Sequence, residues 1–150
     1  MLTVSILAGG RGKSSPEQAL ADGYLAKARD AGRALGFSGF GLTEISDAKL
    51  SQSLSAAPHP VLLDETGRAK SSRDFANWLA ALRDQGLPGL TFVIGGADGF
   101  SKQDRAHARA VLSFGAQTWP HLLVRPMLAE QIYRAMTILN GHPYHRDGSR

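Results

Sequence analysis

The sequence contains no cysteine. This absence excludes disulfides, thiolate nucleophiles and zinc sites with sulfur ligands. No apolar run approaches the roughly 20 residues that a membrane-spanning helix needs. The first residues, 2–7, also lack the basic region and long apolar stretch of a signal peptide. We therefore expect a cytoplasmic protein that makes no membrane contact.

Charge and length set further bounds. The chain has 17 Lys and Arg against 13 Asp and Glu, a net charge of +4, and a pI of about 9.8. This modest excess favours a polyanionic partner. With 150 residues, of which 43% are hydrophobic, the chain has enough apolar material for one core, so we expect a single domain over residues 1–150.

Hydrophobic patterning predicts alternating strands and helices. We expect strands at residues 2–7, 40–45, 60–63 and 90–94, and helices at residues 16–36, 46–56, 72–86, 101–111 and from 126 onward. Residues 90–94 are apolar on both faces, which is typical of a central parallel strand. The alternation predicts an open α/β sheet that binds ligands at the carboxyl ends of its strands.

Two glycine-rich segments follow predicted strands. Residues 94–99, Ile-Gly-Gly-Ala-Asp-Gly, allow a ligand to approach the backbone, although a purely structural turn has the same composition. Residues 7–13 do not form a P-loop, because Leu7 stands where that motif needs glycine. They do resemble the glycine signature of nucleotidyltransferases, so nucleotide binding there is one alternative and a flexible turn is the other.

Several polar residues carry weaker signals. Asp64 and Glu65 follow a strand, but their surroundings favour an ordinary loop. His121 is expected to be a packed loop histidine. His142 and His145 lack a third ligand nearby, so we predict no metal site. The tail that carries them suits phosphate contacts and base stacking, or else it is a solvated terminus; its members are His142, Tyr144, His145, Arg146 and Arg150.

Five segments together resemble one known family. They are Leu62-Leu63-Asp64-Glu65-x-Gly67, Phe92-Val93-Ile94-Gly95-Gly96-Ala97-x-Gly99, Thr118-Trp119-Pro120-His121-x-x-x-Arg125, Leu128-Ala129-Glu130-Gln131-x-Tyr133-Arg134-Ala135 and Gly141-His142-Pro143-Tyr144-His145-Arg146. The family is the bacterial ribosomal RNA large-subunit methyltransferase H group of the SPOUT methyltransferases. The resemblance covers nearly the whole chain and is dense from Val61 onward.

The resemblance implies a fold, a reaction and a cofactor site. The fold is α/β, with a mostly parallel sheet, helices on both faces and a C-terminal trefoil knot, which is an exception to the rule against threaded chains. The reaction is methyl transfer from S-adenosyl-L-methionine, without a metal, to N3 of a pseudouridine in a 23S ribosomal RNA stem-loop. The substrate is the assembled ribosome and the enzyme a homodimer. The implied cofactor residues are Leu63, Gly95, Phe114, Gly115, Ala116, Gln117, Thr118 and Trp119.

On the substrate side, the tail offers the candidate catalytic residues, because N3 of pseudouridine carries a proton that must leave. These candidates are His142, Tyr144, His145 and Arg146. We expect His145 and Arg146 to contact RNA and Tyr144 to position the base. The apolar stripe of the last helix is interpreted as the dimer interface, although a core-facing stripe has the same pattern. A nucleotidyltransferase-like protein and a ribosome-binding protein without activity are the alternatives.

Overall fold

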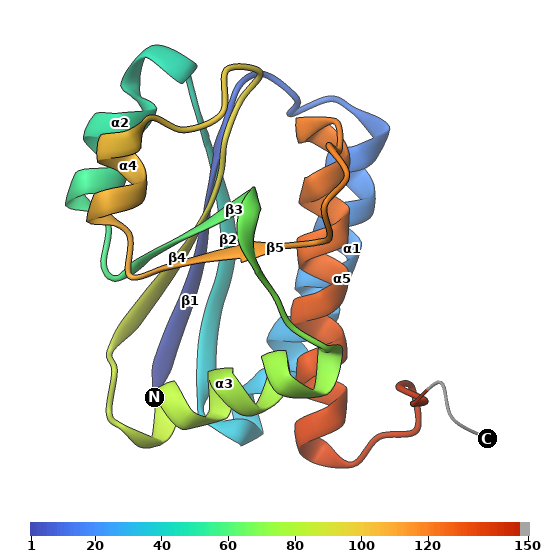
Figure 1. The fold of residues 1–150 in the computed structure, drawn as a ribbon. Coiled ribbons are helices and arrows are strands. Elements are labelled where there is room, and N and C mark those ends of the chain that lie inside the picture. The colour runs from blue at the N-terminus through green and yellow to red at the C-terminus, as the bar shows by residue number, and fades with distance from the viewer. Residues whose placement is uncertain (148–150) are drawn as a thin grey trace.

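The computed structural model describes residues 1–147. Its sheet has five strands in the order β2-β1-β4-β3-β5, and all neighbouring strands are parallel (Figure 1). The elements are β1 (Leu2–Gly9), α1 (Pro16–Gly32), the 3-10 turn η1 (Arg33–Leu35), β2 (Phe37–Ile45), α2 (Asp47–Ala56), β3 (Pro60–Ala69), α3 (Ser72–Asp84), β4 (Gly89–Ile94), α4 (Lys102–His107), β5 (Ala110–Ser113) and α5 (His121–Asn140). The predicted parallel α/β sheet is confirmed.

Helices cover both faces of this sheet. In Figure 1, α1 and α5 stand on one side, and α2 and α4 stand on the other. The larger core lies on the α1 side and includes Leu25, Phe75 and Ile132. A smaller core on the other side joins Leu50 of α2 to Phe100. Every residue of β4 is buried between the two layers, which explains why this strand is apolar on both faces.

The start of α1 is as predicted, but its end is not. The Oγ atom of Ser15 accepts a hydrogen bond from the backbone N–H of Gln18, and Pro16 occupies the first helical position. The α-helix ends at Gly32, and η1 follows it. Gly36, with a φ of 87°, then turns the chain into β2. β2 accordingly begins earlier than the predicted residue 40.

The predicted helix over residues 101–111 is wrong beyond His107. Residues 110–113 instead form β5, and Val111 lies opposite Leu62 of β3. The backbone N–H of Arg109 donates to the carbonyl of Pro60 at 2.7 Å, which begins this pairing. A short apolar run fits a helix and a strand equally well in sequence, so the contact with β3 decides the outcome.

β3 continues well past its predicted end. Leu63 and Arg68 both pair with Leu112, so the residues between them bulge away from β5. Gly67 passes so close to β5 that a Cβ there would lie 2.6 Å from the carbonyl carbon of Val111. Only glycine allows this crossing. The trefoil knot implied by the resemblance stays a prediction.

The last helix differs from its prediction in two respects. α5 begins at His121 and contains Pro126, which was expected to start it. Its apolar stripe faces the core: Leu128, Ile132, Ala135 and Met136 are 0% exposed, and Leu139 packs against the same core. The interpretation of this stripe as a dimer interface is therefore wrong. A core-facing stripe and an interface stripe share one periodicity, so the sequence does not distinguish them.

Candidate active site

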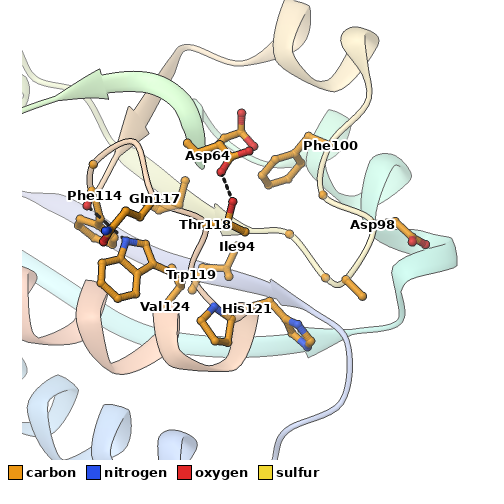
Figure 2. A pocket seen from close by; sticks show the side chains of 18 of the residues that line it. Asp64, Ile94, Asp98, Phe100, Phe114, Gln117, Thr118, Trp119, His121 and Val124 are labelled. Atoms are coloured by element: carbon orange, nitrogen blue, oxygen red, sulfur yellow. Dashed lines mark hydrogen bonds between the residues drawn. The ribbon is translucent and has the colours of Figure 1, made fainter.

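A cavity of about 540 Å³ opens beside the middle of β3, where β4 and β5 end (Figure 2). Its lining includes Leu63 from β3, Ile94 from β4, Phe114 after β5 and Val124 from the first turns of α5. Parallel strands present their carboxyl ends at the same edge of a sheet, so segments that are distant in sequence meet there. The cavity thus occupies the position in which open α/β sheets bind ligands.

The glycine turn after β4 forms one wall. The backbone N–H of Gly99 donates to the carbonyl of Gly96 at 3.1 Å, and Gly99 has a φ of 66°. A Cβ on Gly95 would lie 3.2 Å from the Cα of Gly99, and one on Gly96 would overlap the carboxylate of Asp47. The turn itself therefore requires these glycines. Their backbone also borders the cavity.

α4 and a buried aromatic ring anchor this turn at its far end. Ser101 Oγ accepts from the N–H of Asp104 at 3.1 Å, and the carboxylate of Asp104 accepts from the N–H of Ser101 at 3.0 Å. This arrangement is a capping box, and it fixes the predicted start of the helix at Ser101. Phe100 is 8% exposed and belongs to the core on the α2 side. The turn is therefore fixed by buried residues on both sides.

The loop between β5 and α5 forms the opposite wall. Ser113 Oγ accepts from the N–H of Gly115 at 3.0 Å, and Gly115 has a φ of 110°. Further along, the indole Nε1 of Trp119 donates to the carbonyl of Phe114 at 3.3 Å. The hydroxyl of Thr118 donates to the carboxylate of Glu65, which ties the loop to β3. These bonds give a loop without regular structure a defined shape.

The predicted cofactor residues gather around this cavity. Those that line it are Leu63, Gly95, Phe114, Gly115, Gln117, Thr118 and Trp119. Ala116 belongs to the same loop but does not line the cavity. Figure 2 shows Trp119 beside Phe114, with Thr118 directed toward β3.

Ionisable side chains complete the lining: Asp64, Glu65, Asp98, Arg105 and His121. Burial raises the pKa of Asp64, but hydrogen bonds from Thr66 and Arg105 outweigh it and keep the pKa below its usual value. The guanidinium Nε of Arg105 lies 3.3 Å from the Asp64 carboxylate. The three carboxylates exceed the one permanent cation, so this part of the cavity favours a positively charged ligand.

Sequence reasoning placed these ionisable groups incompletely. The loop predicted for Asp64 and Glu65 is wrong: both lie in β3, which continues to Ala69, and both line the cavity. His121, expected to be a packed loop residue, is the first residue of α5 and also lines it. Asp98 could have been found from its place in the glycine turn. Arg105 could not, because only the fold brings α4 beside Asp64 of β3.

The C-terminal tail packs against the second half of α5. The hydroxyl of Tyr144 donates to Oε2 of Glu130 at 2.7 Å. Nη1 of Arg134 lies 3.1 Å from Nδ1 of His145. Tyr144 and His145 are half-buried. Within the described residues, this part of the tail is therefore a packed segment of the protein and not a solvated terminus.

The tail and the cavity lie apart in this chain. The cavity includes His121 at the start of α5, whereas Glu130, which contacts Tyr144, lies about 14 Å further along at ~1.5 Å per residue. In Figure 1 the tail follows the end of α5 that is distant from the end of β4. No tail residue up to 147 lines the cavity. His142 and Arg146 are exposed, and Arg150 lies outside the described residues.

The glycine-rich loop after β1 lies in a separate depression. Residues 10–15 line it together with Glu44 and Ser46. The backbone N–H of Gly12 donates to Oε2 of Glu44 at 2.7 Å. A carboxylate thus already occupies a donor that a bound phosphate would need, and its charge repels phosphate. This geometry argues against the nucleotidyltransferase interpretation.

Residues 1–147 contain neither a metal-ligand cluster nor a membrane-spanning helix. No group of three or more His, Cys, Asp or Glu side chains there could hold a metal ion. Over the same residues, no helix is long and apolar enough to span a bilayer.

Comparison with known proteins places the chain. Residues 2–145 match a family described as "Predicted SPOUT methyltransferase". A ribosomal RNA large subunit methyltransferase H from Ruegeria pomeroyi is 48% identical over 155 residues, covering 97% of this chain and 99% of that protein. The protein of the same name from Methylocella silvestris is 46% identical over 156 residues, covering 95% and 98%.

One solved structure shares the fold of this chain. A probable methylase family protein from Haemophilus influenzae Rd KW20 superposes with a TM-score of 0.54 at 9% identity, covering 97% of this chain and 70% of that chain. At this identity the likeness concerns the fold alone. Together with the family match and the relatives, it supports the expected SPOUT architecture. The chain therefore belongs to the SPOUT methyltransferases and, among them, to the ribosomal RNA large subunit methyltransferase H family.

Proposed function

We propose that the protein methylates N3 of a pseudouridine in 23S ribosomal RNA, on the assembled ribosome, with S-adenosyl-L-methionine as the methyl donor. The observation that carries this proposal is the convergence of the glycine turn and residues 114–119 on one cavity, in a chain of this family. The names of its relatives supply the substrate class. The proposed substrate also places the protein in the cytoplasm.

The residues of the cavity fit S-adenosyl-L-methionine. Leu63, Ile94 and Phe114 offer apolar surface for an adenine ring, and the backbone groups of residues 114–119 offer donors and acceptors for its edge and for the ribose. Carboxylates such as Glu65 and Asp98 suit a cationic ligand. When bound, this cofactor supplies an electrophilic methyl group on a sulfonium centre.

In this proposal, tail residues activate and position the nucleophile, N3 of pseudouridine. N3 of pseudouridine becomes nucleophilic as its proton leaves, and a histidine can take that proton while a cation stabilises the anion. We assign the contacts with RNA to His145 and Arg146, and positioning of the base to Tyr144. His142 is a further candidate for the proton acceptor. Orientation supplies most of the rate, because the reacting atoms must approach to about 3–3.5 Å.

In a dimer, the tail of one chain can reach the cavity of the other chain. One chain cannot bring Tyr144 to its own cavity in the conformation described, so we propose a homodimer in which each tail serves the partner's cavity. Leu20 and Leu123 support this proposal, because they are 54% and 38% exposed and border an apolar groove of about 690 Å³ between α1, α3 and α5. Exposed apolar residues at a groove are typical of an interface.

Complementation tests the shared site. We expect a chain truncated after Gly141 and a Thr118→Trp variant, whose cavity is filled, each to be inactive. After the two variants are denatured, mixed and refolded, methyl transfer should return. In a mixed dimer, the intact tail of the Thr118→Trp chain meets the intact cavity of the truncated chain. A mixture that stays inactive while sedimentation shows mixed dimers would reject the shared site.

The reaction itself is tested by labelled methyl transfer. Ribosomes that lack the modification are incubated with the protein and methyl-labelled S-adenosyl-L-methionine, and the labelled nucleotide is mapped. We expect one labelled pseudouridine in 23S ribosomal RNA. The absence of label from every ribosomal RNA would reject the proposal. Calorimetry adds a second check, because we expect metal-independent binding of S-adenosyl-L-methionine and no binding of nucleoside triphosphates with magnesium.

A further inference from the structure

A cluster of four side chains connects the tail to α5. Its members are Glu130 and Arg134 on the helix and Tyr144 and His145 on the tail. Glu130 and Arg134 form an i,i+4 ion pair on the helix, with Nη2 of Arg134 2.7 Å from Oε2 of Glu130. The same Oε2 accepts the hydrogen bond from Tyr144 at 2.7 Å. One carboxylate oxygen therefore binds both the helix cation and the tail phenol.

Arg134 contacts two tail residues as well. Its guanidinium lies over the ring of Tyr144, 4.7 Å from the centroid, and its Nη1 lies 3.1 Å from Nδ1 of His145. The ring of Tyr133 also packs edge-on against Tyr144, with 4.9 Å between centroids. Tyr144 is thus held by a hydrogen bond, a cation and a second ring. A solvated terminal residue would not make these three contacts.

His145 is oriented from both ring nitrogens. While Nδ1 faces Arg134, Nε2 lies 2.9 Å from Oδ1 of Asp147, and Asp147 pairs with Arg73 of α3 at 2.9 Å. An arginine beside Nδ1 can only donate, so Nδ1 accepts and the ring proton resides on Nε2, which donates to Asp147. The cluster therefore selects the tautomer of His145 as well as its orientation.

We propose that Glu130 and Arg134 are positioning residues, which hold Tyr144 and His145 of the tail in the orientation that meets the RNA substrate. This inference rests on the proposed function, because it assigns the tail to the substrate. It adds two helix residues that neither reach the cavity nor belong to the predicted catalytic set. The Glu130 carboxylate is the central element, because it binds Tyr144 directly and His145 through Arg134.

The electrostatics agree with this geometry. Burial raises the pKa of Glu130, but the hydrogen bonds from Arg134 and Tyr144 outweigh it and leave the pKa below its usual value. Burial and the hydrogen bond to Glu130 raise the pKa of Tyr144 to about 12. At neutral pH the carboxylate is charged and the phenol keeps its proton, so the donor and acceptor states required by the cluster persist.

Steady-state kinetics on ribosomes test the role. We expect Glu130→Ala to lower kcat/KM for ribosomes by between about tenfold and 100-fold, the loss that follows from misplacing a reacting group. Affinity for S-adenosyl-L-methionine should stay within about twofold, because the cavity lies elsewhere. Glu130→Gln keeps an acceptor for Tyr144 and should recover part of the activity. Asp84→Ala, which removes an exposed ion pair with Arg83, is the matched control and should behave as wild type.

A double-mutant cycle separates positioning from general stability. If Glu130 acts through Tyr144, adding Glu130→Ala to Tyr144→Phe should lower activity much less than Glu130→Ala does in the wild type. Losses that multiply instead would overturn the proposal. A Glu130→Ala variant with wild-type kcat/KM would also overturn it. The same holds if its kcat/KM falls by the same factor as its affinity for S-adenosyl-L-methionine.

A readout without turnover keeps this inference distinct from the proposed function. Chymotrypsin cleaves after Tyr144 only when the ring leaves its packed position. We expect faster cleavage there in Glu130→Ala than in the wild type and in Asp84→Ala. Should the wild type fail to methylate ribosomes while this difference is seen, the proposed function fails and the tail-holding cluster stands. Equal cleavage rates would reject the cluster.

Discussion

Arg125 of α5, which is buried, forms an ion pair with the partly buried Glu44 of β2, with Nη1 of the first 2.7 Å from Oε2 of the second. The same Nη1 donates to the side-chain oxygen of Gln18 in α1 at 2.8 Å, and Glu44 also accepts from the N–H of Gly12. Arg125 is 0% exposed, and its Nε and Nη2 have no partner among the described residues. One guanidinium thus joins α5, α1, β2 and the loop after β1.

Removal of the Glu44 carboxylate should destabilise the fold strongly. Glu44→Ala leaves the Arg125 charge buried without its counter-ion, and we expect a loss of about 3–5 kcal/mol in the free energy of unfolding. Urea denaturation measures this loss. Asp84→Ala, at an exposed pair, is the control and should change stability by no more than about 0.5 kcal/mol. A Glu44→Ala loss as small as that of the control would show that Arg125 relaxes to solvent.

The same ion pair should give stability a pH dependence. Burial raises the pKa of Glu44, but the hydrogen bond and charge of Arg125 outweigh it, so the folded pKa lies below the usual 4.5. A carboxyl group with a lowered folded pKa stabilises the protein fully above its unfolded pKa, and loses that contribution as pH falls through the folded pKa.

Denaturation of wild type and Glu44→Gln at several pH values measures this contribution. Other carboxylates with lowered pKa values, such as Asp64 and Asp104, titrate alike in both proteins, so the difference isolates Glu44. We expect the wild type's advantage to be largest at neutral pH and to shrink once pH falls below 4.5. An advantage that is constant across this range would contradict the assignment.

Truncation after Gly141 should abolish methyl transfer and spare cofactor binding. The deletion removes Tyr144 and His145 but leaves α5 with its C-cap glycine, which has a φ of 74°. No tail residue up to 147 lines the cavity, so calorimetry should show nearly unchanged affinity for S-adenosyl-L-methionine. Unchanged methylation would remove the tail from the reaction, and lost cofactor affinity would show that the tail contributes to the cavity.

Two glycine substitutions should have opposite effects on stability. A methyl group on Gly67 would lie 2.6 Å from the backbone of Val111, so we expect Gly67→Ala to cost about 1–3 kcal/mol or more. Gly23 lies within α1 and has nothing within 4 Å of its would-be Cβ. Gly23→Ala should therefore stabilise the protein by about 0.5–1 kcal/mol. Thermal unfolding measures both, and a neutral Gly67→Ala would show that β3 and β5 can move apart at their crossing.

Sequence patterns predicted the structure correctly where it depends on residues within a single helix, strand or turn. Ser15 and Pro16 begin a helix and Ser101 caps one, because capping involves atoms only a few residues apart. Residues 90–94 are apolar on both faces, and they form a strand buried on both faces. The glycine turn over residues 94–99 was predicted because a turn, like a cap, depends on a few neighbouring residues.

Long-range contacts decided what the patterns left open. Residues 110–113 became a strand because β3 offered hydrogen bonds to them. Arg125 is an ordinary helix cation in sequence, and only the meeting of Glu44 and Gln18 around it allows its burial. Glu130 and Arg134 are one helical turn apart and pair with each other, but the bond from Tyr144 to Glu130 required the tail to fold back.

The sequence by itself determined the first four strands, the starts of α1 and α4, the segments that border the cavity, and the family, because these depend on short patterns of residues near one another along the chain. Tertiary structure decided that the stripe of α5 faces the core and that the tail and the cavity lie apart on one chain. The physical reason is that periodicity records which face of a helix is apolar, whereas only packing selects the surface that covers it.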